Sequence, residues 1–214
     1  QKTCDVFLSE MDKGLAGEKG SLAMLPTYIE TEQEVPYDKP VIVMDAGGTN
    51  FRVASVRFKS DGQPEIAEFQ NFQMPGIERE VGRKEFFGTM AGYVRGLADR
   101  SDSVGFCFSY PIEMFPNKDG RALYFSKEIK APEAARQMIG ENMNEAMQDL
   151  GVSRGKHFVL LNDTVATLLA GRGETSGRQY DSYIGFILGT GTNTAYVEQN
   201  RNIAKAKDLD GGKS

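Results

Sequence analysis

The stretch that most constrains this chain is VIVMDAGGTNFR at residues 41–52, where an apolar run ends in a carboxylate and two glycines. Four consecutive apolar residues are typical of a strand that is covered on both faces. Gly47 and Gly48 can adopt positive φ and have no Cβ, so an anion could approach the backbone N–H groups of the turn. Because no helix-start signal follows, the motif is predicted to be strand, turn, strand.

This pattern differs from two well-known nucleotide-binding loops. A phosphate-binding P-loop has Gly-Lys followed by Ser or Thr at the start of a helix, and a dinucleotide fingerprint has GxGxxG at the start of a helix. Residues 41–58 contain neither. Taken alone, the stretch is explained better by an ordinary hairpin with a Gly-Gly turn than by a phosphate site.

A second stretch of the same kind lies near the end of the chain. The apolar run YIGFIL at residues 183–188 ends in GTGTN at residues 189–193, and apolar residues resume in TAYVE. Two such hairpins suggest two related domains that face a shared cleft and hold one phosphate chain from opposite sides. The repetition therefore favours phosphate binding over two unrelated hairpins.

Asp163 lies between the two hairpins, after the apolar strand 157–161 and at the start of a predicted short helix. A carboxylate at the C-terminal edge of an α/β sheet lies where such proteins bind ligands, and it could accept a hydroxyl proton during phosphoryl transfer. The alternative is a helix N-cap, a position that Asp favours. Lys127 is the nearest candidate cation for a transferred phosphate, although a surface lysine is the more common explanation of any one lysine.

The composition is that of a soluble globular protein with a sizeable core. The net charge of −5 over 214 residues gives no broad basic surface for nucleic acid or an anionic membrane. Cys4 and Cys107 are the two cysteines, which fits a reducing compartment and a packing role. Since no apolar run approaches the length of a membrane helix, we expect a cytoplasmic protein, and the sequence leaves its oligomeric state open.

The apolar patterns also give an order of strands and helices. From residue 41 onward that order is βββαβαβα, which predicts an α/β domain with a mixed five-strand sheet and helices on its faces. A turn at residues 117–120 predicts a separate hairpin. Helical spacing predicts helices at residues 4–15, 83–98 and 132–150 and after Asp163, and the strands of the sheet are expected at 41–44, 51–58, 65–72, 104–111 and 157–161.

Together these segments resemble the eukaryotic-type hexokinase and glucokinase family, within the actin-like sugar-kinase superfamily. The resemblance runs from FLSEMDKGL and MLPT through DAGGTNFR, GFCFSYP, FSKEIK and LLNDTVATLLAG to ILGTGTNTAYVE, and so covers nearly the whole chain. It implies an actin-like ATPase (ribonuclease H-like) fold in three parts. These are an N-terminal helix and lead-in loop (1–39), a first, small domain (40–178) with a sugar-binding excursion at 109–131, and the incomplete start of a second domain (179–214).

The resemblance also assigns residues to sites. The first phosphate site would comprise Asp45, Gly47, Gly48, Thr49, Asn50 and Arg52, and the second Gly189, Thr190 and Gly191. Sugar contacts would fall on Ser109, Ser126, Lys127, Asn162, Asp163 and Asn193. Asp163 matches the catalytic base and Lys127 the lysine that faces the phosphate, while Asp45 would act on Mg²⁺ indirectly. Ser126 and Glu128 stand where the family commonly has threonine and glycine, which leaves the sugar preference open.

The activity implied by the resemblance is Mg²⁺- and ATP-dependent phosphorylation of the 6-hydroxyl of glucose or a related hexose, the first step of glycolysis. One alternative is a catalytically weak, hexokinase-like sugar sensor that regulates a partner. Another, an actin-like ATPase or filament protein, is disfavoured by the FSYP and FSKEIK segments. The family's later sugar-binding glutamates and adenosine-binding segments would lie beyond Ser214, so we expect residues 1–214 alone not to turn over.

Overall fold

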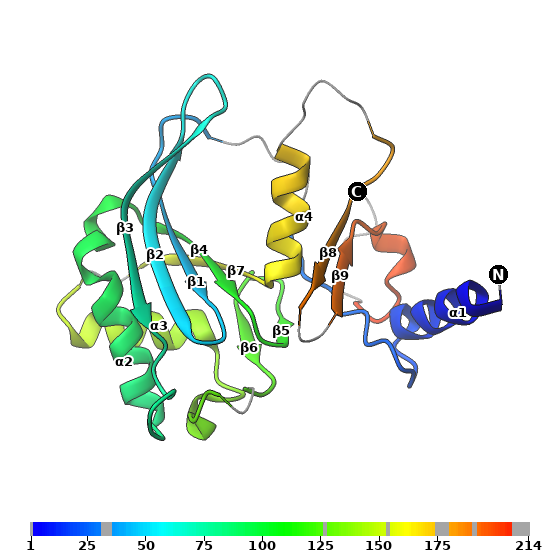
Figure 1. The fold of residues 1–214 in the computed structure, drawn as a ribbon, viewed down its shortest axis with the longest axis horizontal. Coiled ribbons are helices and arrows are strands. Elements are labelled where there is room, and N and C mark those ends of the chain that lie inside the picture. Colours follow the sequence, from blue (N-terminus) through cyan, green and yellow to red (C-terminus); the bar gives the residue numbers. More distant parts are fainter. Residues whose placement is uncertain are drawn as a thin grey trace.

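The main body of the protein is a mixed sheet of five strands in the order β3-β2-β1-β4-β7 (Figure 1). The computed structural model describes residues 2–30, 36–125, 128–152, 155–173, 180–189 and 192–206. Strands β1 to β3 form an antiparallel meander, whereas β1, β4 and β7 run parallel. The strands are β1 Val41–Ala46, β2 Asn50–Phe58, β3 Pro64–Gln73, β4 Ser103–Phe108 and β7 His157–Leu161. The mixed five-strand sheet predicted from the sequence is confirmed.

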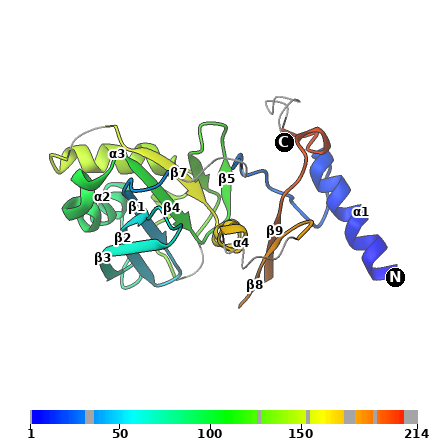
Figure 2. The same cartoon turned by 90° about the horizontal axis from the view of Figure 1, so that it is seen from above.

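The two faces of this sheet are covered differently. One face carries two helices, α2 (Arg83–Val94) and α3 (Ile139–Asp149), and α2 continues as a 3-10 helix over Arg95–Arg100. The other face carries α4 (Asp163–Gly173) (Figure 2). The side chains of β1 and β4 alternate in burial, as expected where successive residues point to opposite faces. Fully buried aromatic rings fill the core toward α2 and α3, among them Phe51, Phe86, Phe106 and Phe108.

A small hairpin of β5 (Ile112–Met114) and β6 (Gly120–Ala122) forms the predicted excursion. Its turn is tied to α3 by the buried carboxylate of Asp119. One oxygen, Oδ1, accepts the N–H groups of Gly120 at 2.7 Å and Gly140 at 2.8 Å, and Oδ2 accepts that of Glu141 at 3.1 Å. A carboxylate is favourable at a helix N-terminus, where backbone N–H groups lack partners within the helix.

The predicted start of α3 at residue 132 is wrong. Residues 132–134 form a short 3-10 helix, and the α-helix begins at Ile139. The chain between them pairs with the excursion instead. Arg136 donates its N–H to Ala122 O at 2.7 Å, and Met138 forms a bridge with Arg121. Pairing with β6 thus takes precedence over the local helical pattern.

Two further strands, β8 (Ile184–Leu188) and β9 (Thr192–Tyr196), form the second predicted hairpin, on the far side of α4 from the sheet. Alternate residues of β8 are exposed, with Ile184 at 72%, Phe186 at 53% and Leu188 at 76%. The predicted N-terminal helix is α1 (Lys2–Ala16), whose Leu15 O accepts the N–H of Lys205 at 3.1 Å. The domain boundary predicted at residue 178 lies outside the described residues.

The contact between β8 and α4 depends on the absence of a side chain at Gly185. This glycine is buried, and a Cβ there would lie 2.4 Å from Thr164 O and 2.9 Å from Leu168 Cβ. Neither atom is the end of a flexible side chain, so the strand or the helix would have to shift. Gly185 therefore sets how closely the second hairpin approaches α4.

We expect Gly185→Ala to lower the free energy of unfolding by about 1–3 kcal/mol, the usual cost of overpacking. Gly92→Ala is the matched control, because Gly92 lies in α2 and a Cβ there would meet nothing within 4 Å. It should instead raise stability by about 0.5–1 kcal/mol through helix propensity. Urea unfolding followed by circular dichroism measures both, and equal stability of the two variants would contradict the close contact.

Candidate active site

The parallel strands bring several of the predicted site residues to one edge of the sheet. In the register of these strands Asp45 lies opposite Cys107, and Cys107 lies opposite Leu161. Asn162 and Asp163 follow directly after Leu161. The carboxyl ends of β1, β4 and β7 therefore meet where open α/β sheets bind ligands.

The turn between β1 and β2 is the first predicted phosphate site. It is closed by the N–H of Gly47, which donates to Asn50 O at 2.9 Å, and Thr49 O accepts the N–H of Met74 at 2.9 Å. Asn50 Nδ2 donates to Thr49 Oγ1 at 3.0 Å, so both polar side chains belong to the turn.

The conformational reason that the sequence suggested for the two glycines is wrong. Neither Gly47 nor Gly48 has φ in the left-handed region. The glycines matter instead because they have no Cβ and leave room at the turn. A Cβ on Gly47 would lie 3.3 Å from Asn50 O, and a Cβ on Gly48 would meet no atom of the described residues within 4 Å. The space beside Gly48 is open, as an approaching ligand requires.

Asp45 and Arg52 form an ion pair next to this turn. Arg52 Nη1 lies 2.7 Å from Asp45 Oδ2, and the two residues face each other in the β1–β2 register. Both side chains are more than a third exposed, so the pair contributes little to stability. The pair matters for position, because it places a cation and a carboxylate beside the turn predicted to bind phosphate.

Asp163 keeps one carboxylate oxygen available. Its Oδ1 accepts the N–H of Thr164 at 2.8 Å, whereas no described residue donates to Oδ2. Asn162 Oδ1 accepts the same N–H at 3.0 Å, in the manner of an N-cap one residue before the helix. Capping of α4 is thus shared with Asn162, and Oδ2 of Asp163 is left without a donor among the described residues.

The second hairpin contacts this edge through a hydrogen bond between two asparagine side chains. Asn193 Nδ2, at the start of β9, donates to Asn162 Oδ1 at 2.9 Å. Gly189 follows β8 and is exposed. Ser109, after β4, is half-buried, and its N–H donates to Ala46 O at 3.0 Å. The predicted sites at Ser126, Lys127, Thr190 and Gly191 lie outside the described residues.

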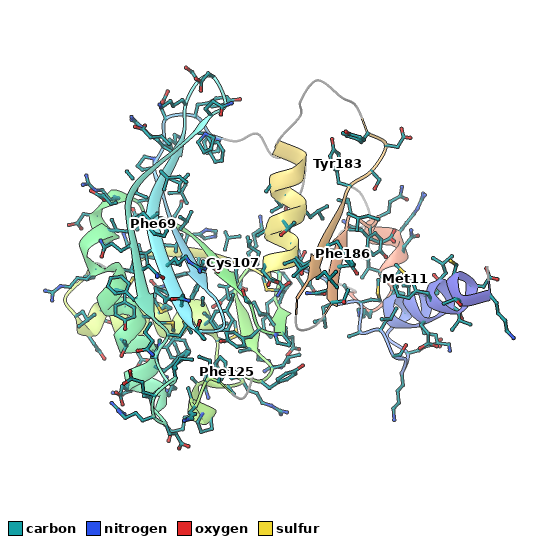
Figure 3. All side chains as sticks on the ribbon, in the orientation of Figure 1. Met11, Phe69, Cys107, Phe125, Tyr183 and Phe186 are labelled. Atoms are coloured by element: carbon teal, nitrogen blue, oxygen red, sulfur yellow. The ribbon has the colours of Figure 1, made fainter. Side chains whose placement is uncertain are left out.

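Cys107 is part of this edge, which the sequence interpretation missed when it assigned the residue to packing. Figure 3 shows it on the side of the sheet that faces α4. Burial, then the nearby carboxylates of Asp45 and Asp163, raise the pKa of its thiol to about 12. Hydrogen bonding with Asp45 raises this pKa further, and hydrogen bonding with Ser109 lowers it. The thiol of Cys107 is therefore neutral beside the two carboxylates. The alternation of β4 and its register with Asp45 are the signals that could have revealed this.

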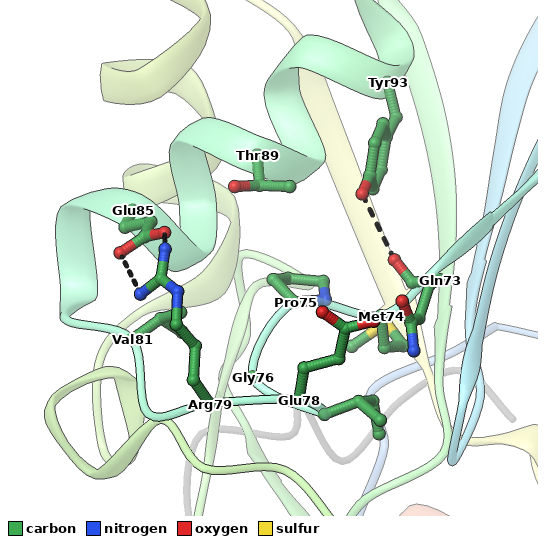
Figure 4. Close-up of a pocket in the computed structure, with 11 residues that line it drawn as sticks. Gln73, Met74, Pro75, Gly76, Glu78, Arg79, Val81, Glu85, Thr89 and Tyr93 are labelled. Atoms are coloured by element: carbon green, nitrogen blue, oxygen red, sulfur yellow. Dashed lines mark hydrogen bonds and ion pairs between the residues drawn. The ribbon is translucent and has the colours of Figure 1, made fainter.

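A separate hollow of about 160 Å³ lies beside α2 (Figure 4). Tyr93 donates its hydroxyl to Gln73 O there at 3.2 Å, and Arg79 pairs with Glu85. None of its lining residues was predicted as a site residue.

Among the described residues, no group of three or more His, Cys, Asp and Glu side chains could hold a metal ion. Nor does any helix in the same part of the chain have the length and apolar composition needed to cross a membrane.

Comparison with known proteins identifies relatives over nearly the whole chain. Two families, both described as hexokinase, match residues 1–172 and residues 183–213. Hexokinase-1 of Schizosaccharomyces pombe is 27% identical over 98% of this chain and 44% of its own length. Hexokinase-3 of Homo sapiens is 30% identical over 91% of this chain and 21% of its own length. The chain thus spans less than half the length of these relatives.

Solved structures agree with the sequence relatives. A hexokinase from Schistosoma mansoni complexed with glucose matches with a TM-score of 0.77 and 25% identity, over 97% of this chain and 47% of its own. A second hexokinase structure matches with a TM-score of 0.68 and 20% identity over 92% of this chain and 48% of its own. The fold class predicted from the sequence, an actin-like α/β fold with a mixed five-strand sheet, is confirmed.

The protonated state of Cys107 gives a prediction for thiol labelling. A pKa of about 12 leaves roughly a thousandfold less thiolate at pH 8 than a free thiol with a pKa near 8.5 would have. Iodoacetamide at pH 8 should therefore modify the exposed Cys4 quickly and Cys107 only after unfolding, as followed by peptide mass spectrometry. Comparable labelling of both cysteines in the folded protein would contradict the placement of Cys107.

Proposed function

The chain belongs to the hexokinase family, and from this premise we propose that the whole protein transfers the terminal phosphoryl group of ATP to the 6-hydroxyl of glucose or a related hexose. The observation that carries the proposal is the shared sheet edge. The open turn at Gly48 lies at the end of β1, and Asp163, with a free carboxylate oxygen, lies at the end of β7. The glucose complex of the Schistosoma mansoni hexokinase supports a hexose as acceptor.

Each group at the edge has a part in the proposed reaction. The turn at residues 47–50 binds the phosphates, and Arg52 adds a positive charge beside it. Asp163 orients the sugar hydroxyl and accepts its proton through Oδ2 as the hydroxyl attacks. Ser109, Asn162 and Asn193 bind the sugar, which places the acceptor between the phosphate turn and the base. Catalysis then depends mainly on positioning.

Mg²⁺ is the metal that we propose to accompany ATP. Such an ion is usually held by one or two carboxylates together with phosphates and water. The partly exposed carboxylate of Asp45 beside the phosphate turn fits that requirement and would act through water. When bound, Mg²⁺ neutralises charge on the phosphates. The roles of Ser126, Lys127, Gly189, Thr190 and Gly191, the cytoplasmic location and the inactivity of residues 1–214 alone stay predictions.

A sugar sensor without catalysis is less well supported. Such a protein needs a sugar site, but it has no need of a carboxylate with a free oxygen at the acceptor position. Asp45 and Asp163 both lie at the sheet edge, and no described residue donates to Oδ2 of Asp163, which supports a role in proton transfer. The next two variants separate the two functions.

Asp163→Asn in the full-length protein should lower kcat by about 10²–10⁴-fold, because an amide cannot accept the hydroxyl proton. Glucose affinity should change much less, since the amide keeps one acceptor oxygen. Asp149→Asn is the control, because Asp149 is an exposed carboxylate at the end of α3. A coupled glucose 6-phosphate assay and calorimetry with glucose measure both quantities. Turnover within a few-fold of wild type would leave Asp163 only a capping role.

Gly48→Val should abolish most ATP use while sugar binding survives. The valine side chain would fill the open space beside the turn, where phosphate must approach the backbone. We expect kcat/KM for ATP to fall by about 10²-fold or more, the scale of losing one oriented donor. Gly96→Val is the control, because Gly96 is exposed and also has open space around it. Unchanged nucleotide affinity by calorimetry would show that this turn is not the phosphate site.

A further inference from the structure

The hydroxyl of Tyr110 contacts the turn at residues 47–50, the proposed phosphate turn, on its carbonyl side. Tyr110 follows β4, is 3% exposed, and its hydroxyl donates to Gly47 O at 3.1 Å and to Gly48 O at 3.4 Å. Its ring is held by Phe108 and Phe125, with ring centroids at 5.2 Å and 5.3 Å. The hydroxyl thus approaches two consecutive carbonyl groups of the turn from a fixed position.

This contact fixes the direction of two peptide groups. In a planar trans peptide the C=O and the N–H of the same unit point in opposite directions, and the described residues contain no cis peptide. Because the carbonyls of Gly47 and Gly48 point at Tyr110, the N–H groups of Gly48 and Thr49 point away from it. Neither N–H has an acceptor among the described residues. Two consecutive N–H groups without partners form an anion-binding concavity.

We propose that Tyr110 is a positioning residue that holds the phosphate turn in its binding conformation. The inference rests on the proposed function, because it assigns the two N–H groups to the phosphates of ATP. Tyr110 contacts the turn on the side opposite the Gly48 and Thr49 N–H groups. Outside the strand ladders, the backbone bonds of the turn to described residues are those of Gly47 N–H to Asn50 O and of Met74 N–H to Thr49 O.

The position of Tyr110 also links the two substrates. It immediately follows Ser109, a predicted sugar contact, whose N–H is bonded to Ala46 O at 3.0 Å. The segment at 109–110 therefore contacts the end of β1 through its backbone and the next turn through the tyrosine hydroxyl. Removing the Tyr110 hydroxyl leaves the bond between Ser109 N–H and Ala46 O intact, so the affinity for glucose should not change.

Tyr93 provides a matched control for a purely structural effect. Its hydroxyl also donates to a backbone carbonyl, that of Gln73, at 3.2 Å, and its ring stacks on Phe72 at 4.1 Å. Each Tyr→Phe change removes one hydroxyl and its contact with main-chain carbonyl groups. Of the two hydroxyls, that of Tyr110 is bonded to the turn itself, so a difference in nucleotide kinetics between the two variants reports on positioning.

The experiment compares wild-type, Tyr110→Phe and Tyr93→Phe full-length proteins in the coupled assay. Loss of a hydrogen bond of ordinary strength should raise KM for Mg·ATP by about three- to tenfold in Tyr110→Phe. The KM for glucose should stay within about twofold of wild type, and Tyr93→Phe should leave both constants unchanged. A Tyr110→Phe protein with the wild-type KM for ATP overturns the inference while the proposed function stands. An inactive wild-type protein overturns the proposed function and the inference with it.

A second measurement needs no variant and covers the case in which Tyr110→Phe does not fold. Amide hydrogen exchange of wild-type peptides that span residues 46–50 should slow at least about threefold on addition of ADP with Mg²⁺ and remain unchanged with glucose alone. Protection by ADP supports the orientation of the Gly48 and Thr49 N–H groups toward phosphate. No protection at saturating ADP overturns it.

Discussion

The parallel pairing of β4 with β1 on one side and with β7 on the other determines which residues meet at the edge of the sheet. The carboxyl ends of these strands lie at the same edge, where the register places Asp45 beside Cys107 and Cys107 beside Leu161. A one-residue slip in either pair would move the side chains of that strand to the opposite face. Asp45 and Asp163 are more than 100 residues apart in the chain, yet both carboxylates lie close enough to Cys107 to raise the pKa of its thiol.

The alternation of side chains along β1 and β4 puts the apolar core residues on one face of the sheet and the predicted site residues on the other. Ile42, Met44 and Ala46 of β1 point into the core toward α2 and α3, and so do Phe106 and Phe108 of β4. The residues between them point to the opposite face of the sheet. Rings that pack edge to face, such as Phe106 and Phe108 with centroids 5.4 Å apart, fix the strands from the core side. Precise placement of the polar residues on the other face depends on this apolar packing.

Local patterns were sufficient to predict the hairpins, the order of strands and helices along the chain, and the position of Asp163 after a strand of the sheet. The apolar runs that stop at glycine, threonine and asparagine specify strand and turn without knowledge of the fold. Three features could not be predicted in this way, because each depends on a partner distant in sequence. Helix α3 starts late because residues 136 and 138 pair with β6. Cys107 belongs to the site because of its register with Asp45, and Tyr110 because its hydroxyl reaches the turn at residues 47–48.

Helix α4 links the sheet to the second hairpin, because it contacts β4 of the sheet and both strands of that hairpin. Its first residue is Asp163, which lies at the edge of the sheet, and its next turns pack on β8 where Gly185 provides room. At the same end, Asn162 accepts the side-chain N–H of Asn193 from β9. A displacement of the second hairpin relative to the sheet would therefore act on α4 and on the amide next to the proposed base, Asp163. The position of Asp163 thus depends on the sheet and on the second hairpin, each of which carries one of the two predicted phosphate turns.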